Sequence, residues 1–305
     1  GLMRPLPFAA FAACSLVTAA HAQPAGVAAS PWRTQLQGGA VHQFDADLDD
    51  GGSFSVNRVF VEAGLSYAFS PRDSVGVALG YGYDGYDFDT GGNGLAALDP
   101  WSDINDFRVS FPLRAGIGDD VDLFAVPSVN WRAESGADLG EAMTGGALVG
   151  GTYRFSDDLR LGAGVGVFTE IEDDATVFPI LLVDWQITED FSLETGQGAG
   201  ATRGPGLTVN WTGVERWRFT LGARWETWRF RLDDGGPAPD GVGEEEAIPI
   251  YLAATYAVIP TVRLGAVAGV DAAGTLTLED EDGRELEEED FDPTPFVGVT
   301  FRARF

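Results

Sequence analysis

The sequence predicts an all-β fold, an antiparallel transmembrane β-barrel of about 14 strands, with about 12 or 16 as the alternatives. Three observations support this prediction. Apolar residues recur at every second position, short connections alternate with long ones, and the chain ends on an alternating segment that stops at an aromatic residue, Phe305. Strands that face lipid on one side and a polar lumen on the other have this pattern.

The first residues are typical of an export signal. Met3 and Arg4 form a short positive start, and the following apolar stretch, PLPFAAFAACSLVTAA, is too short to span a bilayer. The letters AHA before Gln23 match a small-residue cleavage site. The alternative is a lipoprotein signal that is cut before Cys14.

These signals divide the chain into three parts. We expect residues 1–22 to be a cleaved signal peptide, residues 23–31 a short periplasmic segment and residues 32–305 the barrel. Cleavage after Ala22 would remove the only cysteine, so the mature chain would need neither disulfides nor thiolate metal sites.

Composition excludes nucleic acid as a partner. The formal net charge is −28, with 47 acidic residues against 19 basic ones, all of them arginine. Nucleic-acid phosphates require a basic surface, which this balance does not favour. No segment after the signal offers roughly 18 uninterrupted apolar residues, so the sequence predicts no transmembrane helix.

The strand pattern is clearest in residues 106–115. Phe107 and Val109 share one parity, whereas Arg108 and Arg114 share the other. One face of this segment is therefore apolar and the other polar, which predicts a strand. The same alternation runs through residues 59–69, 159–167 and 297–305.

The connections alternate in length. Short, turn-forming ones begin at Ser70, Gly118, Ser156, Thr188, Gly213 and Val258. Long ones begin at Asp45, Asp89, Glu134, Asp233 and Glu279, and two tighter ones lie near Glu172 and Arg203. The six short turns join pairs of strands. Together with a first strand that begins at Trp32 and a last strand that ends at Phe305, they give about 14 strands. Aromatic residues such as Tyr67 and Trp217 fall where strands should cross the headgroups, which favours membrane anchoring.

The last ten residues, FVGVTFRARF, resemble the C-terminal signal of Gram-negative outer-membrane barrels. Val297, Val299, Phe301 and Phe305 carry this resemblance, and Ala303 departs from it because an aromatic is frequent at that position. The resemblance implies recognition by the barrel-assembly machinery, with periplasmic chaperones as earlier partners. Pairing of the last strand with the first would then remove the exposed sheet edge.

Three internal stretches carry a second resemblance. FPILLVDWQITEDFSLETG, GPGLTVNW and RWETWRFRLDD are similar to an uncharacterised proteobacterial family of porin-like outer-membrane barrels. The resemblance spans most of residues 57–305 and supports the architecture without implying a substrate.

Arginine is abundant on the polar parity, which should face the lumen. A change of face near Glu226 or Thr227 would turn Trp228 and Phe230 to lipid and the neighbouring arginines inward. The candidates for a lumenal constriction are Arg58, Arg108, Arg114, Arg218, Arg224, Arg229, Arg231, Glu62 and Glu226. The same parity also carries Arg132, Arg154, Arg160, Arg263, Arg302 and Arg304. Two interpretations stay open, a structural ladder of ion pairs and an electropositive constriction that attracts anions.

The long loops are acidic, so their carboxylates are candidates for binding a metal ion. Asp45, Asp47 and Asp49 alternate as in a calcium loop, but Asp50 stands where such a loop needs glycine and Val56 where it needs glutamate. They are therefore weak metal candidates. The acidic loops could also share divalent cations with lipopolysaccharide phosphates.

Catalysis is not expected. His42 is the only histidine after the signal, and the letters around it, AVHQFDA, offer no nearby serine nucleophile. We therefore expect no enzyme activity and no cofactor.

The sequence thus predicts an outer-membrane protein in contact with lipid and lipopolysaccharide. Its expected role is a narrow passive channel for small solutes, biased toward anions by lumenal arginine. The alternatives are a closed structural barrel whose acidic loops bind divalent cations or lipopolysaccharide, and a lipid-modifying enzyme. Phe124, Phe168 and Tyr251 meeting at one level would favour occlusion, whereas an aligned arginine ring would favour transport.

Overall fold

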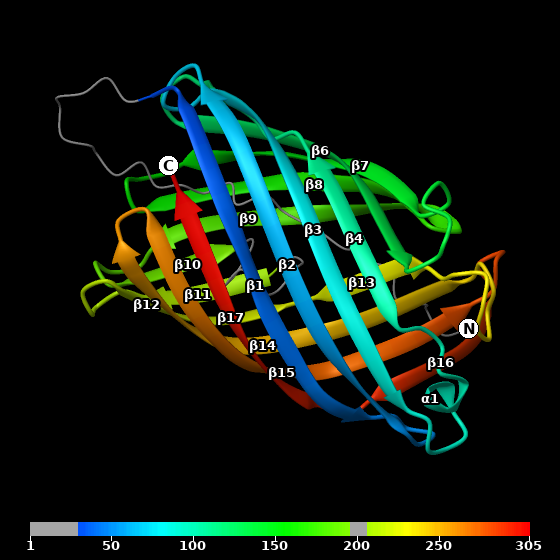
Figure 1. Ribbon diagram of the computed structural model, residues 1–305. Helices are drawn as coiled ribbons and strands as arrows, with labels where there is room; N and C mark the ends of the chain where they lie inside the picture. The colour runs from blue at the N-terminus through cyan, green and yellow to red at the C-terminus, as the bar shows by residue number, and fades with distance from the viewer. Residues whose placement is uncertain (1–29, 196–205) are drawn as a thin grey trace, which may run out of the picture.

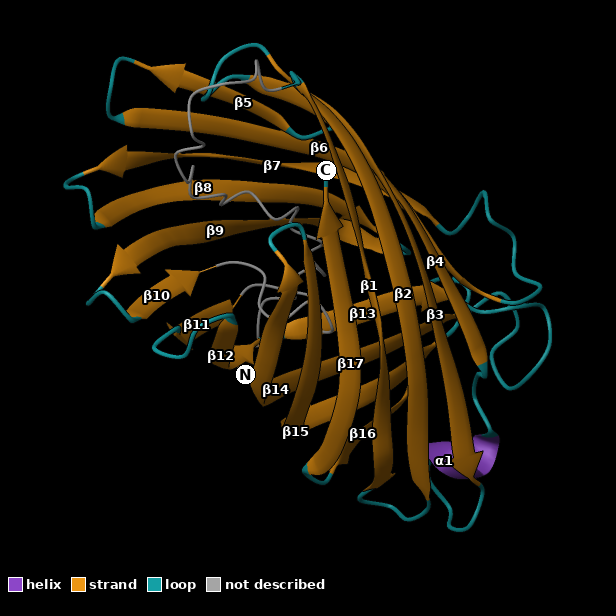
Figure 2. Ribbon diagram, turned by 60° about the vertical axis from the view of Figure 1, so that its left-hand side comes forward, coloured by secondary structure: helices purple, strands orange, loops and turns teal. Residues whose placement is uncertain are grey.

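The computed structural model describes residues 30–195 and 206–305. The predicted signal peptide, most of the predicted periplasmic segment and Arg203 lie outside the described residues. The described chain forms one closed antiparallel barrel (Figures 1 and 2). No helix of the described residues is long and apolar enough to span a membrane.

The barrel contains the predicted number of transmembrane strands. The described chain has 17 strand segments, and three of the transmembrane strands are each broken into two segments, which leaves 14. In chain order they are β1 (Trp32–Asp47), β2 (Ser53–Ala68), β3 (Ser74–Asp89), β4 (Asp103–Ser110) with β5 (Leu113–Ile117), β6 (Val121–Glu134), β7 (Met143–Arg154), β8 (Leu159–Glu170), β9 (Asp173–Gln186), β10 (Phe191–Thr195), β11 (Gly206–Trp211), β12 (Trp217–Arg224) with β13 (Glu226–Arg231), β14 (Val242–Ile259), β15 (Val262–Glu279), and β16 (Glu285–Phe291) with β17 (Thr294–Arg304). A single helical turn, α1 (Leu95–Leu98), lies in the loop after β3.

Two of the three breaks contain proline. Pro112 separates β4 from β5, and Pro293 separates β16 from β17. Proline has no N–H to donate to a neighbouring strand, so it interrupts the ladder of hydrogen bonds. The third break lies at Trp225, between β12 and β13.

The last strand closes the barrel. Cα partners on β1 and β17 include Gly38 with Phe301 and His42 with Val297, and β17 also pairs with β15. Each of the 14 transmembrane strands therefore pairs with a strand on both sides over part of its described length, as lipid requires of a spanning sheet. Val299 and Phe305 point outward with 61% and 71% of their surfaces exposed. The predicted pairing of the last strand with the first is confirmed.

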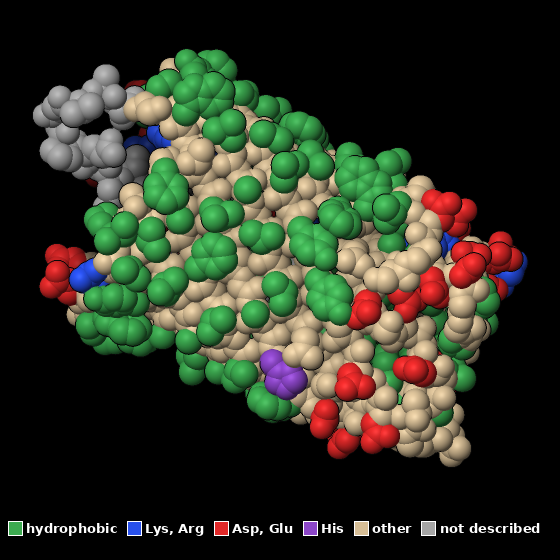
Figure 3. Space-filling model, in the orientation of Figure 1, with side chains coloured by type: hydrophobic (Ala, Val, Ile, Leu, Met, Phe, Trp, Pro, Cys, Tyr) green, Lys and Arg blue, Asp and Glu red, His purple; other side chains and the backbone are tan. Residues whose placement is uncertain are grey.

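The outer wall is apolar. Side chains of one parity are exposed on strand after strand, as Val59 and Val61 are on β2. Figure 3 shows hydrophobic side chains spread over this wall and acidic ones gathered where α1 and β16 lie. At the other end of the barrel, aromatic rings stand edge to face, with Tyr67 5.0 Å from both Trp32 and Phe69 between ring centroids. The predicted aromatic girdle is therefore present at that end.

The two ends differ in their connections. Short connections follow β2, β5, β7, β9, β11 and β14, as predicted, and we call this the short-turn end. In the first of these turns the Ser70 hydroxyl donates to Asp73 over 2.5 Å, and this bond lowers the pKa of the Asp73 carboxyl. The opposite end, which we call the long-loop end, carries the longer segments 90–102, 135–142 and 232–241.

An apolar cluster lies in the lumen at the long-loop end. It includes Phe54 from β2, Tyr86 from β3, Trp101 from the following loop and Phe230 from β13. The full cluster is Ala46, Leu48, Phe54, Val56, Tyr86, Phe88, Leu95, Ala96, Trp101, Ile104, Trp228, Phe230, Leu232, Ala238, Ala247, Leu276, Leu278 and Phe291. We call it the upper cluster. β13 also forms a parallel bridge to β6 on the far wall, through Arg231 and Ala133, so the barrel is narrowed here.

The predicted change of face near Glu226 is wrong. Ala223 pairs with Ile250 and Glu226 with Ala247, a step of three residues on both chains, so neither strand gains an extra residue. Trp228, Phe230 and Leu232 therefore lie inside with the upper cluster. Arg229 and Arg231 occupy the opposite face of β13. Protein covers both faces there, so the alternation no longer distinguishes lipid from lumen.

Candidate functional site

Near the long-loop end, lumenal arginines are paired with acids. The Arg58 guanidinium donates to Glu245 over 2.6 Å and lies 3.6 Å from Asp84. It also stands 4.5 Å from the Trp228 ring, and the Tyr86 hydroxyl donates to the same Glu245. These groups are almost fully buried, with 11% of the Arg58 side chain and 1% of the Glu245 side chain exposed. This network joins β2, β3, β13 and β14 across the lumen.

A second network joins β4 and β6. Arg132 donates to Asp106 over 3.0 Å, and Arg108 lies 3.4 Å from the same carboxylate. Arg108 also donates to the Asn130 side chain over 2.8 Å. Arg108 is thus held in a buried ion-pair network.

Three arginines of the β12–β13 strand also interact with acids or with backbone carbonyls. Arg224 lies 3.8 Å from Glu226, and both side chains are buried. Arg229 donates to the Ile171 carbonyl over 2.7 Å and pairs with Glu244 at 3.2 Å. Arg231 donates to the Asp240 carbonyl over 2.7 Å and pairs with Glu172. Arg229 and Arg231 therefore link β13 to the connection between β8 and β9 through a hydrogen bond and an ion pair.

Three more predicted site residues lie toward the short-turn end. Glu62 accepts a hydrogen bond from the Gln37 amide over 3.0 Å. Arg218 lies 3.6 Å from Glu194, and 40% of its side chain is exposed. Arg114 is the cross-strand partner of Phe124 and of Ser74. The structure therefore separates the predicted candidates into two groups at different levels of the barrel.

The short-turn end of the lumen is basic. Eight arginines of the described chain lie on its lumenal face, against four carboxylates. The arginines are Arg33, Arg114, Arg154, Arg160, Arg218, Arg263, Arg302 and Arg304, and the carboxylates are Glu62, Asp122, Asp184 and Glu194. We call this set the basic mouth. Asp122 is engaged by a further arginine, Arg72 of the β2–β3 turn, over 2.7 Å.

Arg263, Arg302 and Arg304 were placed on the lumenal parity from sequence but were not singled out as site residues. Arg263 and Arg302 are direct cross-strand partners on β15 and β17, and Arg304 follows two residues later on the same face. In the part of the chain that the structure describes, no carboxylate lies within ion-pair distance of Arg263 or Arg304. The signal that could have revealed them is the pair of alternate arginines in FRARF, opposite a strand that begins with an arginine.

Between the two ends, apolar side chains line two parts of the wall. Phe124 and Phe168 belong to a cluster on β6–β9 with Val126, Leu148, Phe178 and Ile180. Tyr251 belongs to another cluster, with Val41, Ala253, Val267 and Phe296. Phe124 and Phe168 thus belong to the same cluster, whereas Tyr251 belongs to the other.

The three weak metal-binding candidates do not form a metal site in the described part of the chain. Asp45, Asp47 and Asp49 are exposed, and no group of three His, Cys, Asp or Glu side chains in the described ranges could hold a metal ion. His42 is on the outward parity of β1, where its Nδ1 lies 2.9 Å from the Asn57 side-chain oxygen.

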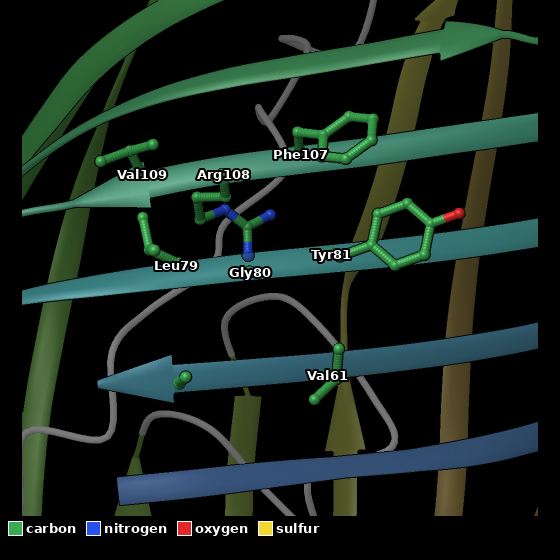
Figure 4. A pocket seen from close by; sticks show the side chains of 8 residues that line it. Val61, Leu79, Gly80, Tyr81, Phe107, Arg108 and Val109 are labelled. Atoms are coloured by element: carbon green, nitrogen blue, oxygen red, sulfur yellow. The ribbon is translucent and has the colours of Figure 1, made fainter. Parts of the chain in front are cut away.

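The outer wall has a shallow apolar groove. It crosses β2, β3 and β4 beside Val61, Leu79, Tyr81 and Phe107 (Figure 4). On the outward face Ala63 is smaller than the Val61, Leu79 and Tyr81 side chains that also line the groove. It belongs to the lipid-facing wall and is separate from the lumenal arginines.

Comparisons support the fold. No protein-family model and no curated protein matches the chain. An outer-membrane channel from Pseudomonas putida F1 superposes with a TM-score of 0.50 at 8% identity, over 93% of this chain and 100% of that one. A Pseudomonas aeruginosa FadL homologue gives 0.47 at 10% identity, over 89% of each chain. The P. putida toluene transporter TodX gives 0.46 at 10% identity, over 91% of each chain.

Identities this low show the fold alone. The first of these structures, together with the closed sheet and the apolar wall, places the chain among outer-membrane β-barrels. The resemblance to a porin-like family stays a prediction.

Proposed function

We propose that the protein is a passive outer-membrane channel for small solutes, with a basic mouth that favours anions. The observation that carries this proposal is the separation of charge along the lumen. Arginines near the long-loop end are paired with carboxylates, whereas the basic mouth has twice as many arginines as carboxylates in the described chain. An excess of guanidinium charge within a low-dielectric wall raises the local concentration of anions.

The proposed channel is narrow. The upper cluster occupies the lumen at the long-loop end, and β13 bridges to the far wall there. The upper cluster and β13 would therefore restrict the path of a solute that enters from that end. This restriction favours small solutes over large ones. We take the short-turn end to be periplasmic, as is usual in this class of barrel.

A closed structural barrel is the second candidate. It is favoured by the same upper cluster and by the buried network around Arg58, which together make the long-loop end resemble a protein core. In that case the acidic segments, such as residues 285–290, would provide the function by binding divalent cations or lipopolysaccharide.

The experiment that separates the two candidates is a conductance measurement in a planar lipid bilayer. We expect purified, refolded protein to give steady single-channel currents that favour anions. The double variant Arg114→Gln with Arg160→Gln should reduce the anion preference because it removes two charges from the basic mouth.

Arg284→Gln is a matched control, since Arg284 is 71% exposed in a loop at the long-loop end and pairs there with Asp280 and Asp282. Its loss should leave selectivity unchanged. Absence of current from a folded barrel would refute the channel proposal and favour the structural one.

A further inference from the structure

The seam that closes the barrel, between β1 and β17, has no turn to set its register. Every other pair of neighbouring strands in the wall is consecutive in the chain, whereas β1 begins at Trp32 and β17 ends at Arg304. A turn fixes the alignment of the two strands it joins. Strands without a turn depend on side chains that fit together in one alignment only.

On the outer face of the seam, a phenylalanine ring lies over a glycine. Gly38 of β1 is the direct cross-strand partner of Phe301 of β17. A Cβ atom added to Gly38 would stand 2.8 Å from the Phe301 Cε1 and 2.6 Å from the Phe60 carbonyl oxygen. The ring therefore occupies the place that a larger residue at position 38 would need, and glycine permits this close approach.

On the lumenal face of the seam, a valine lies over a glycine of the other strand. Val41 of β1 is the cross-strand partner of Gly298 of β17. A Cβ atom added to Gly298 would stand 2.9 Å from the Val41 Cγ2 and 3.1 Å from the Cγ1 of Val267 on β15. The seam thus contains two reciprocal contacts, one with its glycine on β1 and one with its glycine on β17.

The observed alignment is the one in which both contacts form. A shift of two residues would keep the faces of both strands but would place Leu36 or Ala40, instead of a glycine, beneath the outer ring. The same shift would place Thr300 or Phe296 opposite Val41. A shift of one residue would set the outward side chains of one strand against the lumenal side chains of the other.

We propose that the Gly38–Phe301 and Val41–Gly298 contacts, which we call the seam contacts, determine the register in which the barrel closes. Both are contacts of shape, because neither glycine leaves room for a side chain of its own. An added methyl group would overpack the seam, and loss of the ring or of the valine would remove the preference for this alignment. This role is independent of the proposed channel function and of recognition by the assembly machinery.

The register also positions part of the basic mouth. Arg302 is the cross-strand partner of Gln37, and the Arg302 Nε donates to the Gln37 side-chain oxygen over 2.9 Å. The Gln37 amide in turn donates to Glu62 over 3.0 Å. A shift of two residues would place Gln35 or Gly39 opposite Arg302 and would separate it from this chain of hydrogen bonds.

The test is disulfide trapping of the register in the chain refolded in detergent, where the assembly machinery is absent. All variants carry Cys14→Ser, which removes the only native cysteine. Arg304→Cys is combined with Gln35→Cys, its cross-strand partner, or with Gln37→Cys or Arg33→Cys, which would face it only after a shift of two residues. Diagonal neighbours are about 7–8 Å apart between Cα atoms, too far for a disulfide. We therefore expect only the Gln35→Cys pair to cross-link when the seam contacts are intact.

Two variants weaken the seam contacts without adding atoms. Phe301→Ala removes the outer ring, and Val41→Ala shortens the side chain over Gly298. Each should raise the share of shifted cross-links, through Gln37→Cys or Arg33→Cys, by at least about fivefold, because part of the energy that favours the observed alignment is lost.

A third variant overpacks the seam. Gly38→Ala should slow closure of the barrel by at least about fivefold, as followed by heat-modifiability on gels. Gly64→Ala is the matched control, because a Cβ added to this β2 glycine would have the Ala78 Cβ, at 3.8 Å, as its nearest atom outside the adjacent residues. Its rate of closure should stay within about twofold of the wild-type rate, because an ordinary van der Waals contact does not overpack the wall.

Each result bears on the proposal. Shifted cross-links in Phe301→Ala or Val41→Ala, together with slower closure of Gly38→Ala than of Gly64→Ala, would support it. Cross-linking of the Gln35→Cys pair alone in both truncated variants would overturn it. Equal rates of closure for the two glycine variants would overturn it as well.

Discussion

At the scale of single residues, arginine has two roles that depend on its level in the barrel. Arg58 is surrounded by Glu245, Asp84 and two aromatic rings, and it connects strands that are far apart in sequence. Arg263 faces another arginine across the sheet. The first environment neutralises a buried charge, whereas the second places two guanidinium groups opposite each other on the lumenal face. The structural interpretation therefore fits the long-loop end, whereas the anion-attracting one remains a proposal for the basic mouth.

The buried pair of Arg58 and Glu245 should contribute strongly to stability. Removing one partner leaves a buried charge without compensation, so Glu245→Ala should lower the free energy of unfolding by about 3 kcal/mol. Urea unfolding in detergent micelles, followed by tryptophan fluorescence, measures this change. Asp282→Ala removes an exposed partner of Arg284 and should cost less than about 0.5 kcal/mol. Equal effects of the two substitutions would contradict the assignment.

Truncation of Phe230 tests the upper cluster. Its side chain is fully buried at the level where β13 crosses to the far wall. Phe230→Ala should destabilise the barrel by about 3 kcal/mol through the cavity it leaves. It should also increase single-channel conductance, because the narrowed end becomes wider. Unchanged conductance in a folded variant would show that the cluster does not limit the path.

At the scale of elements, the last strand carries a prediction about assembly. The structure confirms that β17 closes the sheet against β1, whereas recognition of its terminal residues remains a prediction. Deletion of Phe305 should reduce the amount of folded barrel in outer-membrane fractions, measured by heat-modifiability on gels. Refolding in detergent should be almost unaffected, since Phe305 is 71% exposed and lies outside β17. An equal loss of folding in detergent would indicate a structural role instead.

The elements show how far alternation can predict the structure. It predicted the short turns and the lumenal face correctly where one side of the strand meets lipid, as on β2. The long connections expected from Asp45 and Glu279 are short in the structure, and β16 occupies the acidic segment after Glu279. Alternation failed on β13, where protein covers both faces and Trp228 points inward. The pairing of Arg58 with Glu245 was also out of reach, because residues 187 positions apart meet only when the barrel closes. A period of two residues identifies the face of the strand on which a side chain lies. It identifies neither the height of that side chain in the barrel nor the residue with which it pairs.

At the scale of the whole molecule, the acidic chain encloses a basic mouth. Acidic side chains gather on the exterior at the long-loop end (Figure 3). The arginines of the basic mouth lie on the lumenal face at the short-turn end. Net charge alone would therefore predict the opposite ion preference from the one that we propose. The lumen, and not the overall charge of −28, should determine which ions pass.

The most direct test is the reversal potential of the wild-type channel in a potassium chloride gradient. The proposed function predicts a reversal potential of the sign that chloride permeation gives, because the basic mouth concentrates anions. Increasing ionic strength should weaken this preference through screening. A reversal potential of the potassium sign, or no current from a correctly folded barrel, would contradict the proposal.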